Sequence, residues 1–362
     1  MHGRLAQPDA LVARVEALGR RWRSEPATDE AYPQARLDQL REAGALAAFA
    51  TIRPGPETAA LDRVLRLVGG GDLSLGRLYE GHVNAAQLVA AYGSPAQRDA
   101  LADDLAASRL FGVWNTEPEP GLRLFRAGDC WRLDGAKVFA TGAGRLDRVL
   151  VTARDENGAK RMALVPVAGL TDRADLTAWR VRGMKGTISG RYDFTGIELD
   201  DAALIGAPGD YEQEPRFSAG AWRFTAVQQG ATEALVRLLR DHLVTKGKDG
   251  DPIQRVRFGA CVAAARGAGQ WVARAAQLAE GGSDDAIAFT LMTRGVVEDA
   301  ALQVMEAAAR AVGTASFFEG DPIDRITRDL GLYLRQPVPD QARERAAAAW
   351  LEADRWGEDA WW

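Results

Sequence analysis

The sequence predicts an α+β protein of three domains: an N-terminal helical domain over residues 1–109, a β-domain over 110–212 and a C-terminal helical bundle over 213–362. Two patterns predict this order. Apolar residues recur every three or four positions in the first and last parts, which is the period of an amphipathic helix. In the middle part they alternate with polar residues in short runs between Gly and Asp turns, which is typical of β-strands.

The N-terminal domain is expected to contain four or five helices. Breaks at Pro26, Pro33 and 54–56 and a turn at 93–95 divide it, because Pro and Gly interrupt helices. Between the breaks the helical spacing is clearest at a set of apolar positions: Leu11, Val12, Val15, Leu18, Leu37, Leu40, Ala43, Leu61, Val64 and Leu65.

The β-domain is expected to form a small sandwich or barrel, because its alternating runs recur at short spacing. The clearest runs are 131–133, 148–152, 162–167 and 191–194. After Glu214 the helical periodicity returns in long stretches that predict a four-helix bundle. These stretches are 224–243, 252–278, 286–312 and 340–351.

Charge and composition exclude several classes of protein. The chain has 362 residues, of which 47% are apolar, so it can bury a large core. Its formal net charge is −5 and it has no strongly basic tract, which argues against a nucleic-acid-binding protein. It also has no run of about 18 uncharged apolar residues, so we expect no membrane association.

The cysteines and histidines suggest neither a disulfide framework nor a metal site. Cys130 and Cys261 lie in different domains. His2, His82 and His242 are too scattered to suggest a zinc site. We therefore expect a soluble protein of a reducing compartment, the cytoplasm.

Two motifs in the β-domain are the most informative feature of the chain. The first is Asn-Thr-Glu-Pro at 115–118, and the second is Gly-Ala-Lys-Val-Phe-Ala-Thr at 135–141. Together they resemble the flavin-binding segments of the acyl-CoA dehydrogenase family, whose fold has the same order of helical domain, β-domain and helical bundle. The resemblance implies that Thr116, Phe139 and Thr141 contact FAD, with Phe139 in the place of the family's Trp.

Further motifs extend the resemblance to nearly the whole chain. Gly-Met-Lys-Gly-Thr at 183–187 is similar to the family's Gly-Met-Arg-Gly-Ser turn, and Arg328 with Asp329 matches a pair in its late bundle. The Arg-x-x-Phe-Gly motif that begins at Arg255 resembles a bundle helix that reaches the FAD of a neighbouring subunit. This implies that Arg255 and Phe258 bind cofactor across an interface, so a homodimer or homotetramer is expected.

The remaining cofactor residues are implied by the resemblance at positions where the sequence departs from it. Gly121 is the glycine that is kept where the family has a Gly-x-Gly-Ser-Asp run facing the phosphates. In the late bundle, Arg310, Gly313 and Thr314 stand near the family's Gln and Gly-Gly, which meet the FAD. A guanidinium at Arg310 suits a diphosphate, because it can donate two parallel hydrogen bonds.

The family's catalytic base has no counterpart in this sequence. A dehydrogenase needs a carboxylate that removes the proton α to the thioester carbonyl. In most members this Glu follows the Arg-Asp pair at a place where this chain has Pro337. In a minority it lies on the first bundle helix, where this chain reads Ala-Trp-Arg-Phe at 221–224. Asp340 and Glu214 are the nearest acidic residues, and neither is in register.

One histidine suggests a different reaction. His82 lies where the family lines the bottom of its substrate cavity. The family's monooxygenases often place a histidine within reach of the flavin, and a histidine of near-neutral pKa can move a proton to or from an oxygen intermediate. His82 is therefore the candidate catalytic residue.

Each of these residues also has a purely structural interpretation. Thr116 can end a strand before Pro118, since X-Pro favours extended or turn conformations. Phe139 can be a core residue of a strand, and Arg255 a solvated side chain. Asp340 can cap the helix that follows it, and His82 can be a hydrogen-bonded helix residue without a catalytic role.

Three functions follow from the resemblance. The first is an FAD-dependent oxidoreductase that dehydrogenates the α,β bond of an acyl thioester with a non-standard base. Its substrate would be an acyl group on CoA or on an acyl carrier protein, and its partner an electron-acceptor flavoprotein. The second is a flavin-dependent monooxygenase or oxidase on the same fold. The third is a catalytically inactive flavin-binding subunit.

Overall fold

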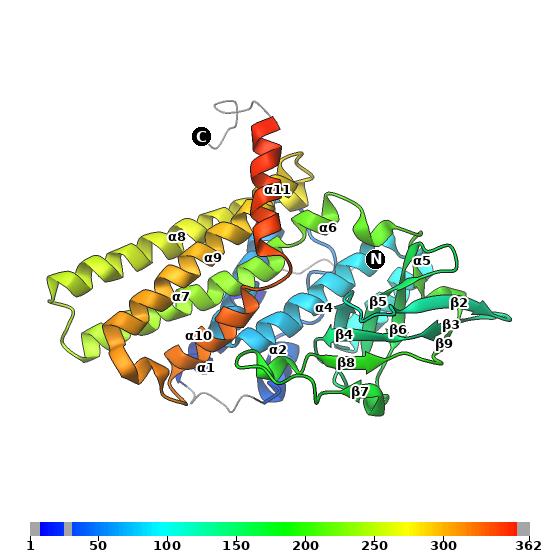
Figure 1. The fold of residues 1–362 in the computed structure, drawn as a ribbon, viewed down its shortest axis with the longest axis horizontal. Coiled ribbons are helices and arrows are strands. Elements are labelled where there is room, and N and C mark those ends of the chain that lie inside the picture. The colour runs from blue at the N-terminus through cyan, green and yellow to red at the C-terminus, as the bar shows by residue number, and fades with distance from the viewer. Residues whose placement is uncertain (1–7, 25–30, 353–362) are drawn as a thin grey trace. The chain divides into compact units, whose positions relative to one another are not determined.

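A computed structural model describes residues 8–24 and 31–352 of the chain (Figure 1). These residues divide into two compact units. The first, called the sheet unit, holds residues 8–21, 31–52 and 74–213. The second, called the bundle unit, holds residues 22–24, 53–73 and 214–352.

Two β-sheets form the centre of the sheet unit (Figure 1). The larger has the strand order β10-β6-β5-β2-β3-β9, with β1 pairing parallel to β5, and the smaller has the order β4-β8-β7. The strands are β1 (Phe111–Trp114), β2 (Arg123–Ala127), β3 (Cys130–Asp134), β4 (Ala136–Ala140), β5 (Arg148–Arg154), β6 (Lys160–Pro166), β7 (Ala174–Asp175), β8 (Gly190–Asp193), β9 (Glu198–Leu199) and β10 (Leu204–Ile205). All of these strands fall within the predicted β-domain.

Helices pack against the larger sheet through apolar faces. Ala85 and Val89 of α4 are buried in one cluster with Phe111 of β1 and Leu150 of β5. The following helix, α5, begins with a capping box in which Ser94 and Gln97 each bond the other's backbone N–H. The helices that lie wholly or mainly in this unit are α1 (Pro8–Ser24), α2 (Gln34–Glu42), α4 (Leu73–Tyr92) and α5 (Pro95–Ala106).

The bundle unit is built from helices (Figure 1). They are α3 (Pro56–Gly71), α6 (Arg216–Ala219), α7 (Trp222–Thr245), α8 (Pro252–Gly281), α9 (Ala286–Val312), α10 (Pro322–Tyr333) and α11 (Pro339–Glu352). The four predicted bundle stretches correspond to α7, α8, α9 and α11. Short 3-10 turns complete the chain: η1 (Thr171–Arg173), η2 (Lys185–Thr187), η3 (Asp201–Ala203), η4 (Asp210–Glu212) and η5 (Gly313–Phe317).

The helix α3 belongs to the bundle unit, although the sequence predicts it as part of an N-terminal domain over 1–109. Glycines explain this placement. A Cβ on Gly69 would overlap the Val227 backbone of α7, and a Cβ on Gly230 would overlap the Arg66 carbonyl of α3. The two backbones can approach this closely only because neither position has a side chain.

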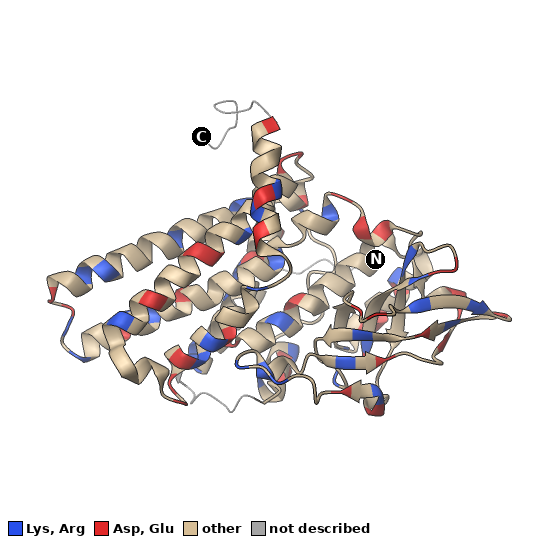
Figure 2. Ribbon diagram, in the orientation of Figure 1, with Lys and Arg blue, Asp and Glu red and all other residues tan. Residues whose placement is uncertain are grey.

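Charges of both signs are mixed along the helices and strands (Figure 2). This agrees with the net charge of −5 and the absence of a basic tract in the sequence. None of the helices in the described residues is long and apolar enough to cross a membrane.

The α3–α7 contact yields a stability prediction. Gly230→Ala should lower the free energy of unfolding of the bundle unit by about 1–3 kcal/mol, because the new methyl group forces two packed helices apart. Urea unfolding followed by circular dichroism measures this change. The matched control is Gly267→Ala on α8, where a Cβ would meet nothing within 4 Å. The control should be neutral or stabilising by up to about 1 kcal/mol, since Ala favours the helix. Equal effects of the two changes would contradict the proposed packing.

Candidate functional site

A β-bulge in β4 presents Phe139 at the surface of the sheet unit. Lys137 pairs with Tyr192 of β8 and Ala140 pairs with Gly190, so β4 has one extra residue between these pairs. Phe139 lies in this bulge with φ of 52°, in the left-handed region that side-chain-bearing residues rarely adopt. Its ring is 64% exposed. Bulges often redirect a side chain beside a functional site, and here the bulge turns a large apolar ring outward.

Lys137 connects the two sequence motifs inside the sheet unit. Its side chain is fully buried, and its Nζ donates to the Asn115 carbonyl at 2.9 Å, to Glu117 Oε2 at 2.6 Å and to Thr152 Oγ1 at 3.2 Å. Burial lowers the pKa of Lys137, and its hydrogen bond to Glu117 opposes that shift. An ammonium has three donors, so this group is fully satisfied. We call these four residues the Lys137 clamp.

The two threonines of the motifs lie beside the bulge. Thr116 is exposed, and its carbonyl oxygen accepts the N–H of Val138 at 3.0 Å. Thr141 Oγ1 lies 3.0 Å from Ser189 Oγ, and its carbonyl accepts Trp114 Nε1 at 2.9 Å. The backbone of Thr116 and that of Thr141 therefore lie close to the bulge that carries Phe139.

Trp179 adds a second aromatic ring to this face, and the motifs did not indicate it. Its ring meets the ring of Phe139 edge to face, with centroids 6.4 Å apart. Trp179 Nε1 donates to the Met184 carbonyl at 3.2 Å, which fixes the orientation of the indole. The exposed ring of Phe139 is thus supported from one side.

Gly121 lies under the carboxylate of Glu117. A Cβ at this position would collide with the Glu117 side chain, and the neighbouring Leu122 N–H donates to Glu117 Oε2 at 3.3 Å. Within the structure, Gly121 makes room for a member of the Lys137 clamp. Its assignment to the cofactor's phosphates stays a prediction.

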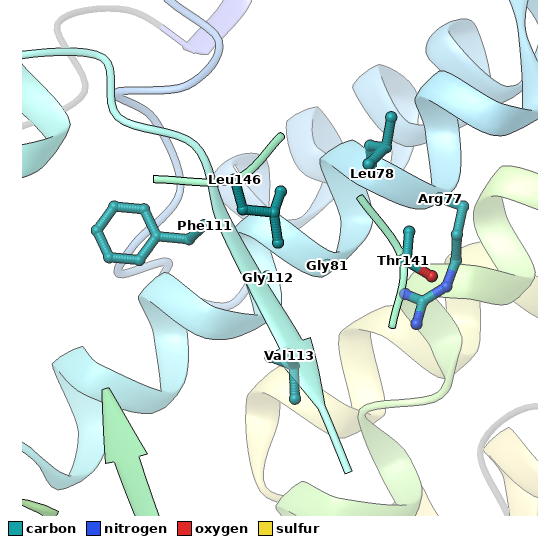
Figure 3. Close-up of a pocket in the computed structure, with 8 residues that line it drawn as sticks. All are labelled: Arg77, Leu78, Gly81, Phe111, Gly112, Val113, Thr141 and Leu146. Carbon is teal, nitrogen blue, oxygen red and sulfur yellow. The ribbon is translucent and has the colours of Figure 1, made fainter. Parts of the chain in front are cut away.

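A small pocket opens beside Thr141 (Figure 3). It has an empty volume of about 200 Å³ and is lined by Arg77, Leu78, Gly81, Phe111, Gly112, Val113, Thr141 and Leu146. Arg77 and Thr141 lie on the same side of it (Figure 3). Arg77 is ion-paired with Glu80 one turn further along α4. The pocket thus combines an apolar wall with one charged and one hydroxyl group.

His82 is buried in the sheet unit and both of its ring nitrogens bond to backbone. The Phe111 N–H donates to Nδ1 at 3.1 Å, so Nε2 bears the proton and donates to the Leu46 carbonyl at 2.7 Å. Burial lowers the pKa of His82 to about 4. This geometry favours the structural interpretation of His82 over proton transfer, because neither nitrogen is available to a substrate.

In the bundle unit, Arg255 and Phe258 lie in the first turns of α8. Arg255 is exposed and its Nε donates to the Asp249 carbonyl at 2.6 Å. Ile253 and Val256 on the same turns are also strongly exposed. A guanidinium beside exposed apolar side chains has the composition of an interface rather than of an ordinary solvated face.

Arg310, Gly313 and Thr314 lie at the end of α9. Because α8 and α9 are joined by a short turn and run antiparallel, this end lies at the same end of the bundle as the start of α8 (Figure 1). Arg310 Nε donates to Glu306 Oε1 at 2.6 Å, and Thr314 is exposed. The predicted site residues therefore fall in two groups, one in each unit, and His82 lies in the sheet unit.

The predicted position of the base has no carboxylate. Pro337 lies between α10 and α11, and its carbonyl accepts Arg294 Nη2 at 2.6 Å. The same nitrogen donates to the Gln336 carbonyl at 2.8 Å. The guanidinium carbon of Arg294 also lies 5.3 Å from the ring centroid of Phe224, in the stretch where the alternative base was sought. An arginine therefore links the two base positions.

Both nearby acidic residues have structural roles. Glu214 accepts the backbone N–H and the hydroxyl of Ser218, and its carboxylate lies 3.8 Å from Arg345. Asp340 is exposed in the first turn of α11, where a carboxylate interacts favourably with the helix dipole. The helix begins at Pro339, so Asp340 is the second residue of the helix and the interpretation of Asp340 as its N-cap is wrong.

The Lys137 clamp yields a second stability prediction. Lys137→Met should lower the free energy of unfolding by about 3 kcal/mol, because it leaves a carboxylate and a carbonyl without their buried donor. In a double-mutant cycle with Glu117→Gln, the coupling energy should reach about 1–3 kcal/mol. The control is Lys160 and Glu212, a more exposed Lys–Glu pair of the same unit, for which about 0–1 kcal/mol is expected. A coupling no larger than the control would argue against the clamp.

His82 yields a pH prediction. The unfolded imidazole titrates near 6.5 and the folded one near 4, so between these values only the unfolded state binds the proton. The free energy of unfolding should therefore fall as the pH decreases through this window, by at most about 3 kcal/mol. His82→Gln should flatten this dependence, and His242→Gln should largely preserve it. Thermal unfolding between pH 4.5 and 7.5 measures both, and identical pH profiles for wild type and His82→Gln would refute the assignment.

Curated relatives, among them the following two, match parts of the sequence, and no protein-family model matches it. A cyclohex-1-ene-1-carbonyl-CoA dehydrogenase of Geobacter metallireducens is 28% identical over 235 residues, which is 60% of this chain and 62% of the relative. A dibenzothiophene monooxygenase of Rhodococcus erythropolis is 24% identical over 222 residues, 55% of this chain and 52% of the relative. The matches thus span between half and two thirds of each relative's length.

Solved structures match nearly the whole chain. The FMN-bound structure of TdsC from Paenibacillus sp. A11-2 superimposes with a TM-score of 0.82 at 18% identity, over 94% of this chain and 97% of that one. Butyryl-CoA dehydrogenase from Megasphaera elsdenii superimposes with a TM-score of 0.81 at 16% identity, over 97% and 100%. The fold predicted from the order of helices and strands is thereby confirmed. The chain therefore has the acyl-CoA dehydrogenase fold, and part of its sequence is similar to that of an acyl-CoA dehydrogenase.

Proposed function

We propose that the chain is a flavin-dependent oxidoreductase. The observation that supports this most directly is the ring of Phe139, which a bulge turns outward between two threonines close in the structure, Thr116 and Thr141. A flat apolar ring with flanking hydroxyls suits an isoalloxazine, because it offers a stacking surface and hydrogen bonds to the ring edge. The flavin supplies the redox chemistry, and these residues would orient it.

We propose FAD as the flavin. Arg255, Phe258, Arg310, Gly313 and Thr314 would then bind its pyrophosphate and adenosine half, with the guanidiniums donating to the phosphates. The FMN bound in TdsC makes the shorter flavin the alternative. Titrating the protein with FAD and with FMN separates the two, since FAD should bind more tightly if the bundle residues contact its adenosine half.

The first candidate reaction is α,β-dehydrogenation of an acyl thioester. It is favoured by the similarity to the cyclohex-1-ene-1-carbonyl-CoA dehydrogenase, whose name gives a CoA thioester as substrate. The thioester would be carried by CoA or by an acyl carrier protein, and the electrons would pass to an acceptor flavoprotein. The base that removes the α proton would come from a position other than Pro337 or 221–224.

The second candidate reaction is oxygenation by a monooxygenase or oxidase. It is favoured by the guanidinium of Arg294 between the two base positions, because a permanently charged cation cannot remove a proton. The dibenzothiophene monooxygenase relative is consistent with it. A flavin-binding subunit without turnover remains the third function, and it would show no reaction in either test below.

We propose a homodimer or homotetramer in which copies meet at one end of the bundle unit. The exposed apolar residues Ile253, Val256, Phe317 and Phe318 support this, because large apolar side chains gathered at one end favour burial against a second copy. Arg255 would then reach the neighbour's flavin. A cytoplasmic location is part of the same proposal, supported by the two free cysteines.

The reaction is tested by mixing the flavin-loaded protein with acyl-CoAs of several chain lengths without oxygen. Dehydrogenation should bleach the oxidised flavin band, because electrons enter the flavin from the thioester. Oxygenation should leave the band intact, and instead the chemically reduced protein should consume oxygen and modify an added substrate. If the protein shows no bleaching and no substrate-coupled oxygen use, both candidate reactions are overturned and the inactive subunit is left.

Phe139 provides a test of the flavin site itself. Phe139→Ala should weaken flavin binding about tenfold, since stacking of an aromatic pair contributes on the order of 1 kcal/mol. The stability should change by no more than about 0.5 kcal/mol, because the ring is exposed. Leu351→Ala, which shortens another exposed apolar side chain, serves as the control. Fluorescence titration with flavin measures the affinity, and unchanged binding in Phe139→Ala would count against the site.

A further inference from the structure

In the cluster of charged side chains around Arg294, the positive charge of Arg294 itself has no carboxylate partner among the residues that the structure describes. Glu298, one turn further along α9, is ion-paired with Arg335 at 2.6 Å and Arg343 at 3.1 Å. Arg343 also pairs with Asp299 at 2.8 Å. Arg294 forms no ion pair with a carboxylate of the described residues. This cluster therefore contains three guanidiniums and two carboxylates. Arg335 and Arg343 are paired with the carboxylates, and Arg294 carries the surplus positive charge.

Burial makes this surplus charge significant. Arg294 is partly buried on α9, and burial lowers the pKa of its guanidinium while Glu298 opposes the shift. A cation that loses hydration without gaining a counter-ion is costly, and an arriving anion would relieve that cost. The carbonyls of Gln336 and Pro337 engage a single nitrogen, Nη2. A guanidinium has five N–H donors, so further donors are available for an oxyanion.

The loop that Arg294 holds is strained. Val338, the next residue after Pro337, has φ of 49° and is 54% exposed. A β-branched residue rarely adopts this left-handed conformation, and such strain persists only where surrounding contacts impose it. Here the contacts are the hydrogen bonds from Arg294 and the bond from the Ala342 N–H to the Val338 carbonyl at 3.1 Å. Arg294 and this loop are thus fixed to each other by hydrogen bonds.

We propose that Arg294 binds an anionic oxygen group of the substrate, where other members of the family present their catalytic carboxylate. A carboxylate, sulfinate or phosphate group matches the planar guanidinium through two parallel hydrogen bonds. The residue orients the substrate and takes no proton. This inference rests on the proposed function only in assuming that the anion belongs to an acyl thioester. It narrows the substrate class to thioesters that have a second negative group on the acyl chain.

The test compares succinyl-CoA with butanoyl-CoA, which replaces the terminal carboxylate by a neutral methyl group. Isothermal titration should show that the full-length protein binds succinyl-CoA at least tenfold more tightly. Arg294→Gln, which keeps a donor for the loop carbonyls, should abolish this preference, and Arg294→Lys should retain part of it. Arg240→Gln, a change at an exposed arginine of α7, should leave it intact.

The outcomes separate this inference from the proposed function. Equal affinity for both thioesters in the wild type, or an unchanged preference in Arg294→Gln, would overturn the anion site. A lower melting temperature in both Arg294 variants with the preference retained would assign the residue to holding the loop alone, which also contradicts the proposal. Flavin content measured in the same samples tests the flavin site independently, since the titration does not require a bound flavin.

Discussion

The buried ammonium of Lys137 is the interaction on which the candidate site depends. It joins the segment after β1, through Asn115 and Glu117, to β5, through Thr152. Together with the bond from the Val138 N–H to the Thr116 carbonyl, these bonds hold the exposed loop against the bulge that presents Phe139. The two sequence motifs are therefore coupled by the protein itself and not only by a shared cofactor. Because the charge is buried and saturated, its net contribution to stability is small compared with the cost of removing one partner.

Of the six non-glycine residues with positive φ in the described chain, two are exposed, one in each unit. Phe139 and Val338 both adopt positive φ with large apolar side chains, which neither local propensity nor burial favours. Strained residues that are exposed are held by their neighbours, here the Lys137 clamp and Arg294. The first position lies on the face that suits a flavin, and the second adjoins the place of the missing base. Both positions thus share one feature, an anchored cation next to a strained residue.

The order of elements could be predicted because periodicity reports it directly, and the strands fall between 111 and 205 as expected. The placement of α3 could not, because it depends on contacts between distant parts of the chain, of Gly69 with the Val227 backbone and of Gly230 with the Arg66 carbonyl. The motifs indicated Phe139, but not its exposure, since a one-residue bulge leaves no periodic signal. A lysine within a strand, Lys137, is the sequence feature that could have indicated the clamp. The sequence permits both a catalytic and a structural interpretation of His82, because it does not reveal that two backbone groups occupy both ring nitrogens.

The central claim is that the face around Phe139 receives a flavin while the bundle unit offers a cation in place of a base. A crystal structure of the protein grown with FAD tests it most directly. The account predicts an isoalloxazine lying across the ring of Phe139, with its edge in hydrogen-bonding distance of the Thr116 or Thr141 hydroxyl. A structure without bound flavin, or with the flavin elsewhere and the Phe139 ring turned into the core, would contradict it.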